Sequence, residues 1–294
     1  MLRSRAYTLI ELIVAVSIVA VLAAVLLPVF GQAKLAAQAS VCMSNFKQAT
    51  FSATLYMSDY DDRFALSRYT TSSSATSADD RTWVQLVLPY SREFRLFRCP
   101  SDYTQRPDSK AVFDEDLVPG DTYTRYYTAS KHTNIGYNYI YLSPLIRLQG
   151  TISPLSRSNV EINDPSAMLV FGDSVHDVTS DGRPQGGGNY LIVPPCRYAL
   201  VGRVRRDTFR LENVPNSAFY IDAIKWDVEG PGTPIHSPQL SGGLWPWHNE
   251  KLTAIFADGH ARRIRVSEAA EGCRIRTDWG GYVYDLSRYV WDLD

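Results

Sequence analysis

The residues best suited to chemistry lie near the C-terminal end of the chain and beside one apolar run. His248, Asp258 and His260 are close in sequence, and Asp173 follows a short apolar segment, with His176 just beyond it. Imidazole and carboxylate groups suit divalent metals and acid–base work. The sequence thus makes His248, Asp258 and Asp173 candidate metal ligands. Alternatively, Asp258 belongs to an Asp-Gly hairpin turn and His248 is structural, and the turn chemistry favours this alternative.

Four cysteines are the other reactive side chains: Cys42, Cys99, Cys196 and Cys273. No pair has C-x-x-C spacing, so the sequence does not indicate a zinc ribbon or a thioredoxin-type site. Four cysteines can pair in three ways, and the sequence alone does not choose among them. If the body of the chain lies outside the cytoplasm, these cysteines can be oxidised to disulfides.

The common catalytic signatures are missing from the sequence. It contains no G-x-S-x-G, P-loop, G-x-G-x-x-G, H-E-x-x-H or C-x-x-C-H motif. The three glycines at 186–188 fit a loop better than a phosphate cradle. A net charge of −1 gives no sign of a nucleic-acid surface. We therefore expect no enzymatic activity, no required cofactor and no nucleic-acid partner.

One acidic residue, Glu11, interrupts an otherwise apolar N-terminal segment. Arg3 and Arg5 precede it, and the stretch from Leu12 to Phe30 carries no charge. At about 1.5 Å per residue this helix is long enough to cross a bilayer core of about 30 Å. A carboxylate near the centre of such a segment costs about 2.5 kcal/mol or more, so it usually has a partner. The segment therefore predicts a membrane helix in which Glu11 has a specific role.

The stretch Ala6-Tyr7-Thr8-Leu9-Ile10-Glu11 resembles the class III signal of type IV pilins and pseudopilins. Ala6 stands where that family usually has glycine. The resemblance implies cleavage between Ala6 and Tyr7 by a prepilin peptidase, followed by N-methylation of Tyr7. It also implies that the Glu11 carboxylate neutralises the N-terminal ammonium of a neighbouring subunit, because opposite charges in hydrocarbon cost less together than apart.

The same resemblance implies a location and a set of partners. Arg3 and Arg5 place the N-terminus in the cytoplasm, with a single pass through the inner membrane. After assembly the body lies in an extracytoplasmic or cell-surface filament. The implied partners are copies of the chain or related subunits, the prepilin peptidase, an inner-membrane assembly platform with its ATPase, and membrane lipid before assembly.

Other interpretations of the N-terminal segment remain open. Gly31-Gln32-Ala33 has the small-x-small spacing of a secretory cleavage site, which would leave a mature chain that begins at Lys34. The segment could also be a plain anchor with an incidental acid. A membrane-tethered extracytoplasmic binding or enzymatic domain could use the same anchor.

The helix is expected to continue to about Tyr60. Pro28 removes a backbone donor and predicts a kink, and in the pilin family a proline here belongs to the assembling helix. An apolar stripe at helical spacing follows and should dock on the body. The residues of the stripe are Cys42, Phe46, Ala49, Ala53, Tyr56 and Tyr60. Asn45, Ser52 and Asp59 are expected to lie away from it.

Cys42 and its neighbours, Cys99-Pro100, and the His248-x9-Asp258-Gly spacing resemble a large bacterial subgroup of pilin-like proteins. This resemblance implies a Cys42–Cys99 disulfide, which leaves Cys196 for Cys273. Related pseudopilins hold calcium near the C-terminal end with Asp and backbone oxygens. No residue-by-residue match to that calcium site is present, so calcium remains a possibility only.

The body is expected to be β-rich. We predict a short helix with Trp83 packed inward and strands at 135–142, 168–171, 189–193 and 198–205. In the first of these, Tyr137, Tyr139 and Tyr141 should share one face. An Asp-Gly type I′ hairpin is expected at Asp258.

The predicted fold is α+β, with a long N-terminal helix packed on an antiparallel β-sheet. Its parts are a leader at 1–6, a transmembrane or filament-core helix at 7–30, an amphipathic continuation at 31–62 and a globular domain at 63–294.

Overall fold

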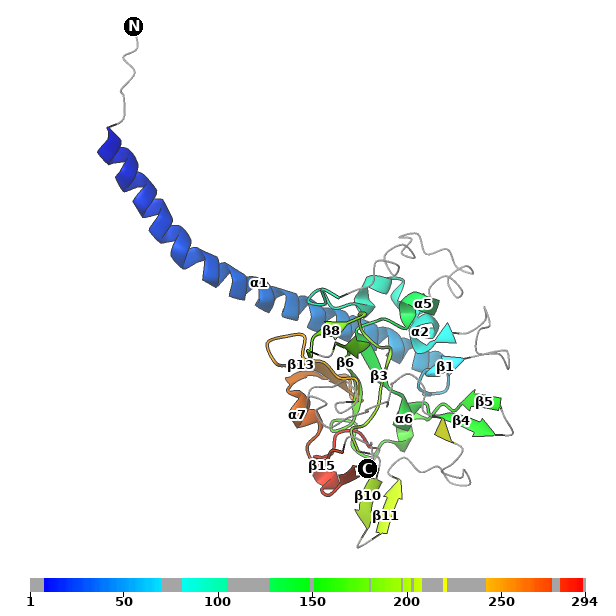
Figure 1. The fold of residues 1–294 in the computed structure, drawn as a ribbon. Helices are drawn as coiled ribbons and strands as arrows, with labels where there is room; N and C mark the ends of the chain where they lie inside the picture. The colour runs from blue at the N-terminus through cyan, green and yellow to red at the C-terminus, as the bar shows by residue number, and fades with distance from the viewer. Residues whose placement is uncertain are drawn as a thin grey trace.

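The computed structural model describes residues 8–69, 81–104, 127–148, 151–179, 181–196, 198–201, 204–207, 219–220, 242–276 and 281–292. One long helix, α1 (Leu9–Asp59), leads into a mixed α/β body. Figure 1 shows the N-terminal half of α1 projecting from the body, whereas its C-terminal half lies along it. The expected α+β fold, a long helix packed on a largely antiparallel sheet, is confirmed.

Local chemistry explains where α1 begins and ends. Thr8 is the N-cap: its Oγ1 accepts a hydrogen bond from the Glu11 backbone N–H, and the Glu11 carboxylate accepts one from the Thr8 N–H. This reciprocal capping box satisfies two backbone donors that the helix cannot pair. At the other end, Asp61 and Asp62 both have a φ of 54°, which is incompatible with a continuing helix. The helix runs through Pro28 without ending.

The other elements are short. Within the described residues, the other helical segments are α2 (Trp83–Ser91), η1 (Phe94–Phe97), α5 (Tyr127–Ser130), α6 (Tyr139–Leu142), η2 (Asn159–Glu161), α7 (Val266–Ala269) and η4 (Leu286–Arg288). The strands are β1 (Arg68–Tyr69), β2 (Arg81–Thr82), β3 (Ile135–Asn138), β4 (Leu145–Leu148), β5 (Thr151–Pro154), β6 (Leu169–Asp173), β7 (Asp177–Val178), β8 (Pro184–Gln185), β9 (Leu191–Ile192), β10 (Tyr198–Val201), β11 (Val204–Asp207), β12 (Phe219–Tyr220), β13 (Leu252–Phe256), β14 (Ala261–Ile264), β15 (Cys273–Arg274) and β16 (Tyr282–Val283).

The central sheet has the order β14-β13-β6-β3-β9. All its pairings are antiparallel except that of β3 with β9. Strands β6 and β13 are buried along their whole length. Ile135 pairs with Asp173 and Ala254 pairs with Gly172, so the end of β6 lies beside the start of β13. Side chains at these two positions are therefore brought together by the sheet itself.

Trp83 anchors the core beside this sheet, as the sequence predicted. Helix α2 begins at this residue, and the indole is buried. Its ring packs against those of Phe97, Tyr137 and Phe171, and its Nε1–H donates to the Tyr190 carbonyl at 2.6 Å. A buried indole that also satisfies its polar atom fixes α2 against the sheet.

The apolar stripe of α1 faces the body, with three differences from expectation, one of which is that Asn45 is half-buried and donates to the Arg98 carbonyl. Its members from Cys42 to Tyr56 are buried. Tyr60 is 52% exposed because the helix has already ended and its ring stacks on Tyr56 at 4.2 Å. Ser52 is buried, although the pattern placed it on the outer face, and its hydroxyl donates to the Gln48 carbonyl. A serine bonded within its own helix can occupy a buried face at little cost.

Two predicted strands differ from the structure. Residues 135–142 form β3 and then helix α6. Asn138 ends β3 opposite Ile192 of β9 and is the N-cap of α6, and its side-chain amide donates to the carbonyls of Leu169 and Trp291. Tyr137, Tyr139 and Tyr141 are all buried, so they do not mark one face of a strand. Residues 198–205 fall in two antiparallel strands, β10 and β11, in which Val201 pairs with Val204.

The hairpin at Asp258 is confirmed, but its turn type is not. Strands β13 and β14 pair antiparallel, and the Gly259 N–H donates to the Phe256 carbonyl at 2.8 Å. Of the two Asp-Gly residues, Gly259 alone has a positive φ, of 85°. A type I′ turn requires positive φ at both central residues. The longer loop lets Asp258 keep ordinary backbone angles while Gly259 takes the left-handed position.

Candidate functional site

The first candidate site is the exposed part of α1. The large apolar side chains from Leu9 to Val41 are between 51% and 76% exposed. By length and composition, α1 is long and apolar enough to cross a membrane. This apolar surface has no cover from the described part of the body, so it is available to lipid or to other helices.

Glu11 lies near the start of this surface. Its Oε2 accepts hydrogen bonds from the Thr8 backbone N–H at 2.9 Å and from the Thr8 hydroxyl at 2.8 Å. The carboxylate is therefore held by its own helix turn in the single chain. Ala6 and Tyr7, the predicted processing residues, lie outside the described residues. The assembly role of Pro28 stays a prediction.

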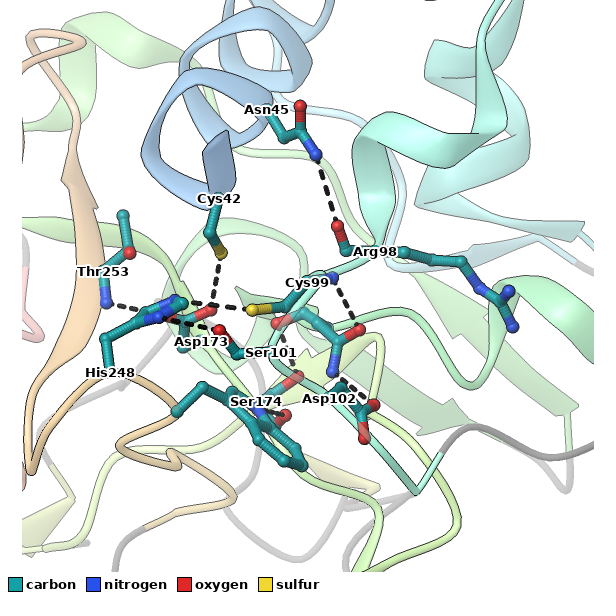
Figure 2. Close-up of polar contacts among 12 residues, drawn as sticks. Cys42, Asn45, Arg98, Cys99, Ser101, Asp102, Asp173, Ser174, His248 and Thr253 are labelled. Atoms are coloured by element: carbon teal, nitrogen blue, oxygen red, sulfur yellow. Dashed lines mark hydrogen bonds and ion pairs between the residues drawn. The ribbon is translucent and has the colours of Figure 1, made fainter. Parts of the chain in front are cut away.

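The second candidate site is a buried cluster of Cys42, Cys99, Asp173 and His248 (Figure 2). Cys42 comes from the docked half of α1, and Cys99 comes from the segment that follows η1. Asp173 ends β6, and His248 precedes β13. Four distant parts of the sequence thus meet where the helix crosses the sheet.

The ligand atoms of the cluster lie within 4.8 Å of one another. The Cys42 thiol donates to Asp173 Oδ1 at 3.5 Å. Cys99 Sγ lies 3.4 Å from His248 Nε2, and the same nitrogen lies 3.6 Å from Asp173 Oδ2. All four side chains point to one centre, as Figure 2 shows.

The predicted Cys42–Cys99 disulfide is not formed in the structure. Both cysteines are buried thiols. The two thiols share a hydrogen bond, and each sulfur also contacts a polar group, Asp173 for Cys42 and His248 for Cys99. The predicted Cys196–Cys273 disulfide is confirmed, with a sulfur–sulfur distance of 2.09 Å.

The predicted grouping of acidic and histidine residues is correct for one pair only. Asp173 and His248 meet in the cluster. Asp258 and His260 instead bind each other at 2.6 Å on the exposed hairpin, at the opposite end of β13. The ring of His176 lies against that of His132, outside the cluster.

The buried environment favours the neutral form of these groups. A hydrogen bond with Cys99, followed by burial, raises the pKa of the Cys42 thiol far above its ordinary value. Burial also raises the pKa of Asp173 to about 7, against the effect of the Thr253 backbone N–H. Burial and the positive charge of Arg263 lower the pKa of His248 to about 4. The imidazole is therefore neutral at pH 7 and keeps a lone pair for an electrophile.

Residues around the cluster orient its members through hydrogen bonds. The Thr253 N–H donates to Asp173 Oδ2 at 2.6 Å, and Ser101 Oγ lies 3.3 Å from His248 Nδ1. Asn134 Oδ1 accepts from the Cys99 N–H at 2.9 Å. Side chains that are fixed in this way are preorganised, which a binding site requires.

Helix α1 also holds the segment that carries Cys99. Asn45 Nδ2 donates to the Arg98 carbonyl at 3.4 Å, and Gln38 Nε2 donates to the Pro100 carbonyl at 3.1 Å. A groove of about 450 Å³ runs beside this contact and is lined in part by Gln32, Ser101 and His248. His248 is the cluster residue that lines this groove.

The sequence does not reveal Cys42 and Cys99 as members of this cluster. Their spacing gives no metal signature, since the four residues lie on four separate segments. Two signals were available: Cys42 begins the buried stripe of α1, and Asp173 ends a fully apolar strand. Neither signal says that the two residues meet.

Comparison with known proteins identifies the N-terminal segment. Residues 1–27 match the prokaryotic N-terminal methylation motif. No curated protein and no solved structure matches the chain, and the resemblance of the C-terminal His-x9-Asp-Gly spacing is not confirmed. The matched segment contains Glu11 and most of the exposed part of α1. The methylation motif and the exposed apolar helix support a type IV pilin-like protein that is anchored in a membrane by α1.

Proposed function

We propose that this chain is a structural subunit of a type IV pilus-like or type II secretion pseudopilus filament. The observation that carries the proposal is the exposed apolar half of α1, which begins in a prepilin-type motif. Fully burying one Leu, Ile or Val side chain is worth about 1.5–3 kcal/mol. Lipid covers these side chains before assembly, so once the subunit leaves the membrane the helix must regain that cover by packing against copies of itself.

Glu11 fixes the axial offset between neighbouring α1 helices in the proposed filament. Its carboxylate is bonded to Thr8 in the single chain and can be shared with a neighbour's N-terminal ammonium, the methylated amine of Tyr7 after processing. An ion pair in an apolar filament core costs far less than either charge alone. A neighbour that is shifted along the helix axis would leave both charges unpaired, so the pair selects one stagger.

The proposed partners follow from this mechanism. A prepilin peptidase cleaves between Ala6 and Tyr7, and lipid covers α1 until assembly. An inner-membrane platform and its ATPase extract the subunit into an extracytoplasmic filament. The proposed role is structural and non-enzymatic.

Glu11→Gln tests the proposal because it removes the charge and keeps the shape. The chain is expressed with its own assembly machinery, and sheared filaments are separated from membranes and quantified with an antibody against the body. We expect the variant to be processed and to remain in the membrane, with little or none in the filament fraction. Ser17→Ala is the matched control, because the Ser17 hydroxyl in the same segment donates to the Ile13 carbonyl of its own helix; it should assemble normally.

Three results would count against a filament subunit. One is normal assembly of Glu11→Gln. Another is unmodified chain that stays entirely in the membrane fraction, as a membrane-tethered binding or enzymatic domain would. The third is a mature N-terminus at Lys34, which N-terminal sequencing of native material would detect.

A further inference from the structure

We propose that Cys42, Cys99, Asp173 and His248 form a zinc site that fastens α1 to the body. The four side chains are buried, and their ligand atoms lie within 4.8 Å of one another. One ligand comes from the helix and three come from the domain beneath it. The site does not depend on filament assembly, so this proposal and the proposed function can fail separately.

The distances fit a tetrahedral ion. Bonds of about 2.3 Å to sulfur and about 2.0–2.2 Å to nitrogen or oxygen, at tetrahedral angles, place ligand atoms about 3.3–3.8 Å apart. Cys42 Sγ is 3.5 Å from Asp173 Oδ1, and Cys99 Sγ is 3.4 Å from His248 Nε2. His248 Nε2 is 3.6 Å from Asp173 Oδ2. These three contacts have the spacing of a coordination shell, within a group whose ligand atoms all lie within 4.8 Å of one another.

The donor types select the metal. Two thiolates, one imidazole and one carboxylate are a set that zinc accepts in four-coordinate sites. Calcium and magnesium take oxygen ligands and higher coordination numbers, so a centre with two sulfurs disfavours them. The calcium considered from the sequence therefore does not suit this centre.

The charges of the proposed site balance. Binding of Zn²⁺ releases one proton from each of Cys42 and Cys99. If Asp173 is protonated, its proton is released as well. No electrons are transferred. Two thiolates, a carboxylate and the ion leave one negative charge. Arg263, which lines the groove beside His248 and whose positive charge lowers the pKa of both Asp173 and His248, is the nearby cation.

Two of the proposed ligands, His248 and Asp173, have hydrogen-bond partners that orient them. Ser101 Oγ lies 3.3 Å from His248 Nδ1, which leaves Nε2 for the ion. The Thr253 N–H holds Asp173 at 2.6 Å. Such partners orient metal ligands, and losing one typically costs about 10–100-fold in metal affinity. His248 and Ser101 both line the groove along α1.

The competing chemistry is a disulfide between Cys42 and Cys99. It would release two protons and pass two electrons to an external disulfide oxidant, and it would leave Asp173 and His248 buried without an ion. Metal and disulfide exclude each other at this centre, so one preparation can decide between them.

The test uses the full-length chain, extracted from membranes in mild detergent without chelator, with Zn²⁺ as the sole added metal. Elemental analysis should find a single zinc ion per chain. X-ray absorption should show two sulfurs at about 2.3 Å and two nitrogen or oxygen ligands at about 2.0–2.2 Å. These measurements need no variant, so a variant that fails to fold does not affect them.

Matched variants then assign the ligands. Losing a residue that only orients a metal ligand typically lowers metal affinity about 10–100-fold. Asp173→Asn and His248→Gln remove ligands themselves and should lower the zinc affinity by more than that. Asp258→Asn and His260→Gln change the same residue types in the exposed hairpin pair and should leave the affinity unchanged. Equal losses in both sets would show zinc binding elsewhere and would overturn the assignment.

Two other results overturn the proposal. Peptide mapping after alkylation without reduction could recover Cys42 and Cys99 as a linked peptide, which would show a disulfide. Alternatively, both thiols could be alkylated while the chain takes up no Zn²⁺, which would leave only a hydrogen-bonded cluster.

Discussion

Gly259 shows how the backbone of one residue decides a local structure. Its φ of 85° lies in the left-handed region, and a side chain added there would meet nothing within 4 Å. The limitation at this position is therefore backbone strain and not space. For an L-residue this conformation costs about 1–2 kcal/mol, and asparagine tolerates it better than β-branched residues do.

We expect Gly259→Val to lower the free energy of unfolding by about 1–2 kcal/mol, because valine must adopt the left-handed backbone or open the β13–β14 turn. Urea titration of the full chain in detergent measures the change. Gly259→Asn is the matched control and should lose less. If valine proved as stable as asparagine, the left-handed turn described here would be incorrect.

At the scale of elements, α1 carries two surfaces with different partners. Phe46 on the inner face is 1% exposed, whereas Phe51 on the outer face is 65% exposed. Both are phenylalanines in the docked half of the same helix, so their removal has the same intrinsic effect on helix formation. The difference between them isolates the energy of docking α1 on the body.

Phe46→Ala should lower the free energy of unfolding by about 3–5 kcal/mol, because it leaves a cavity in the core. Phe51→Ala should change it by no more than about 0.5 kcal/mol, as is usual for surface positions. Urea titration of the two variants, compared with the unmodified chain, measures both. Similar losses in the two variants would contradict the docking of α1 through its Phe46 face.

At the scale of the whole molecule, the exposed and docked halves of α1 separate membrane anchoring from folding. The buried residues of α1 begin at Ala39, beyond the most apolar stretch. The body therefore gains little packing from residues 9–30. What those residues add is an apolar surface that must be covered by lipid or by other subunits.

A chain that begins at Gly31 should be a soluble monomer with the same body. Size-exclusion chromatography without detergent tests solubility and mass, and near-UV circular dichroism tests whether the aromatic core is retained. The full-length chain under the same conditions is the control and should aggregate. Loss of the near-UV signal in the shortened chain would mean that the apolar half of α1 contributes to folding the body.

The sequence by itself determined α1 and the hairpin, because their causes are local. The Thr8 cap, the apolar run, the buried stripe and the Asp-Gly turn each depend on residues within a few positions of one another. The prepilin-type motif is likewise contiguous, so it was recognisable before any fold was known.

Only the tertiary structure decided the cluster. Cys42 and Asp173 are 131 residues apart, and Cys99 and His248 are 149 residues apart. Their meeting depends on where α1 crosses the sheet and on the β6–β13 register, which side-chain types do not encode locally. The resemblance implied that Cys42 and Cys99 lie next to each other, and in the structure they do, as two thiols. The structure added that Asp173 and His248 share that place, because the end of β6 and the approach to β13 lie beneath the helix.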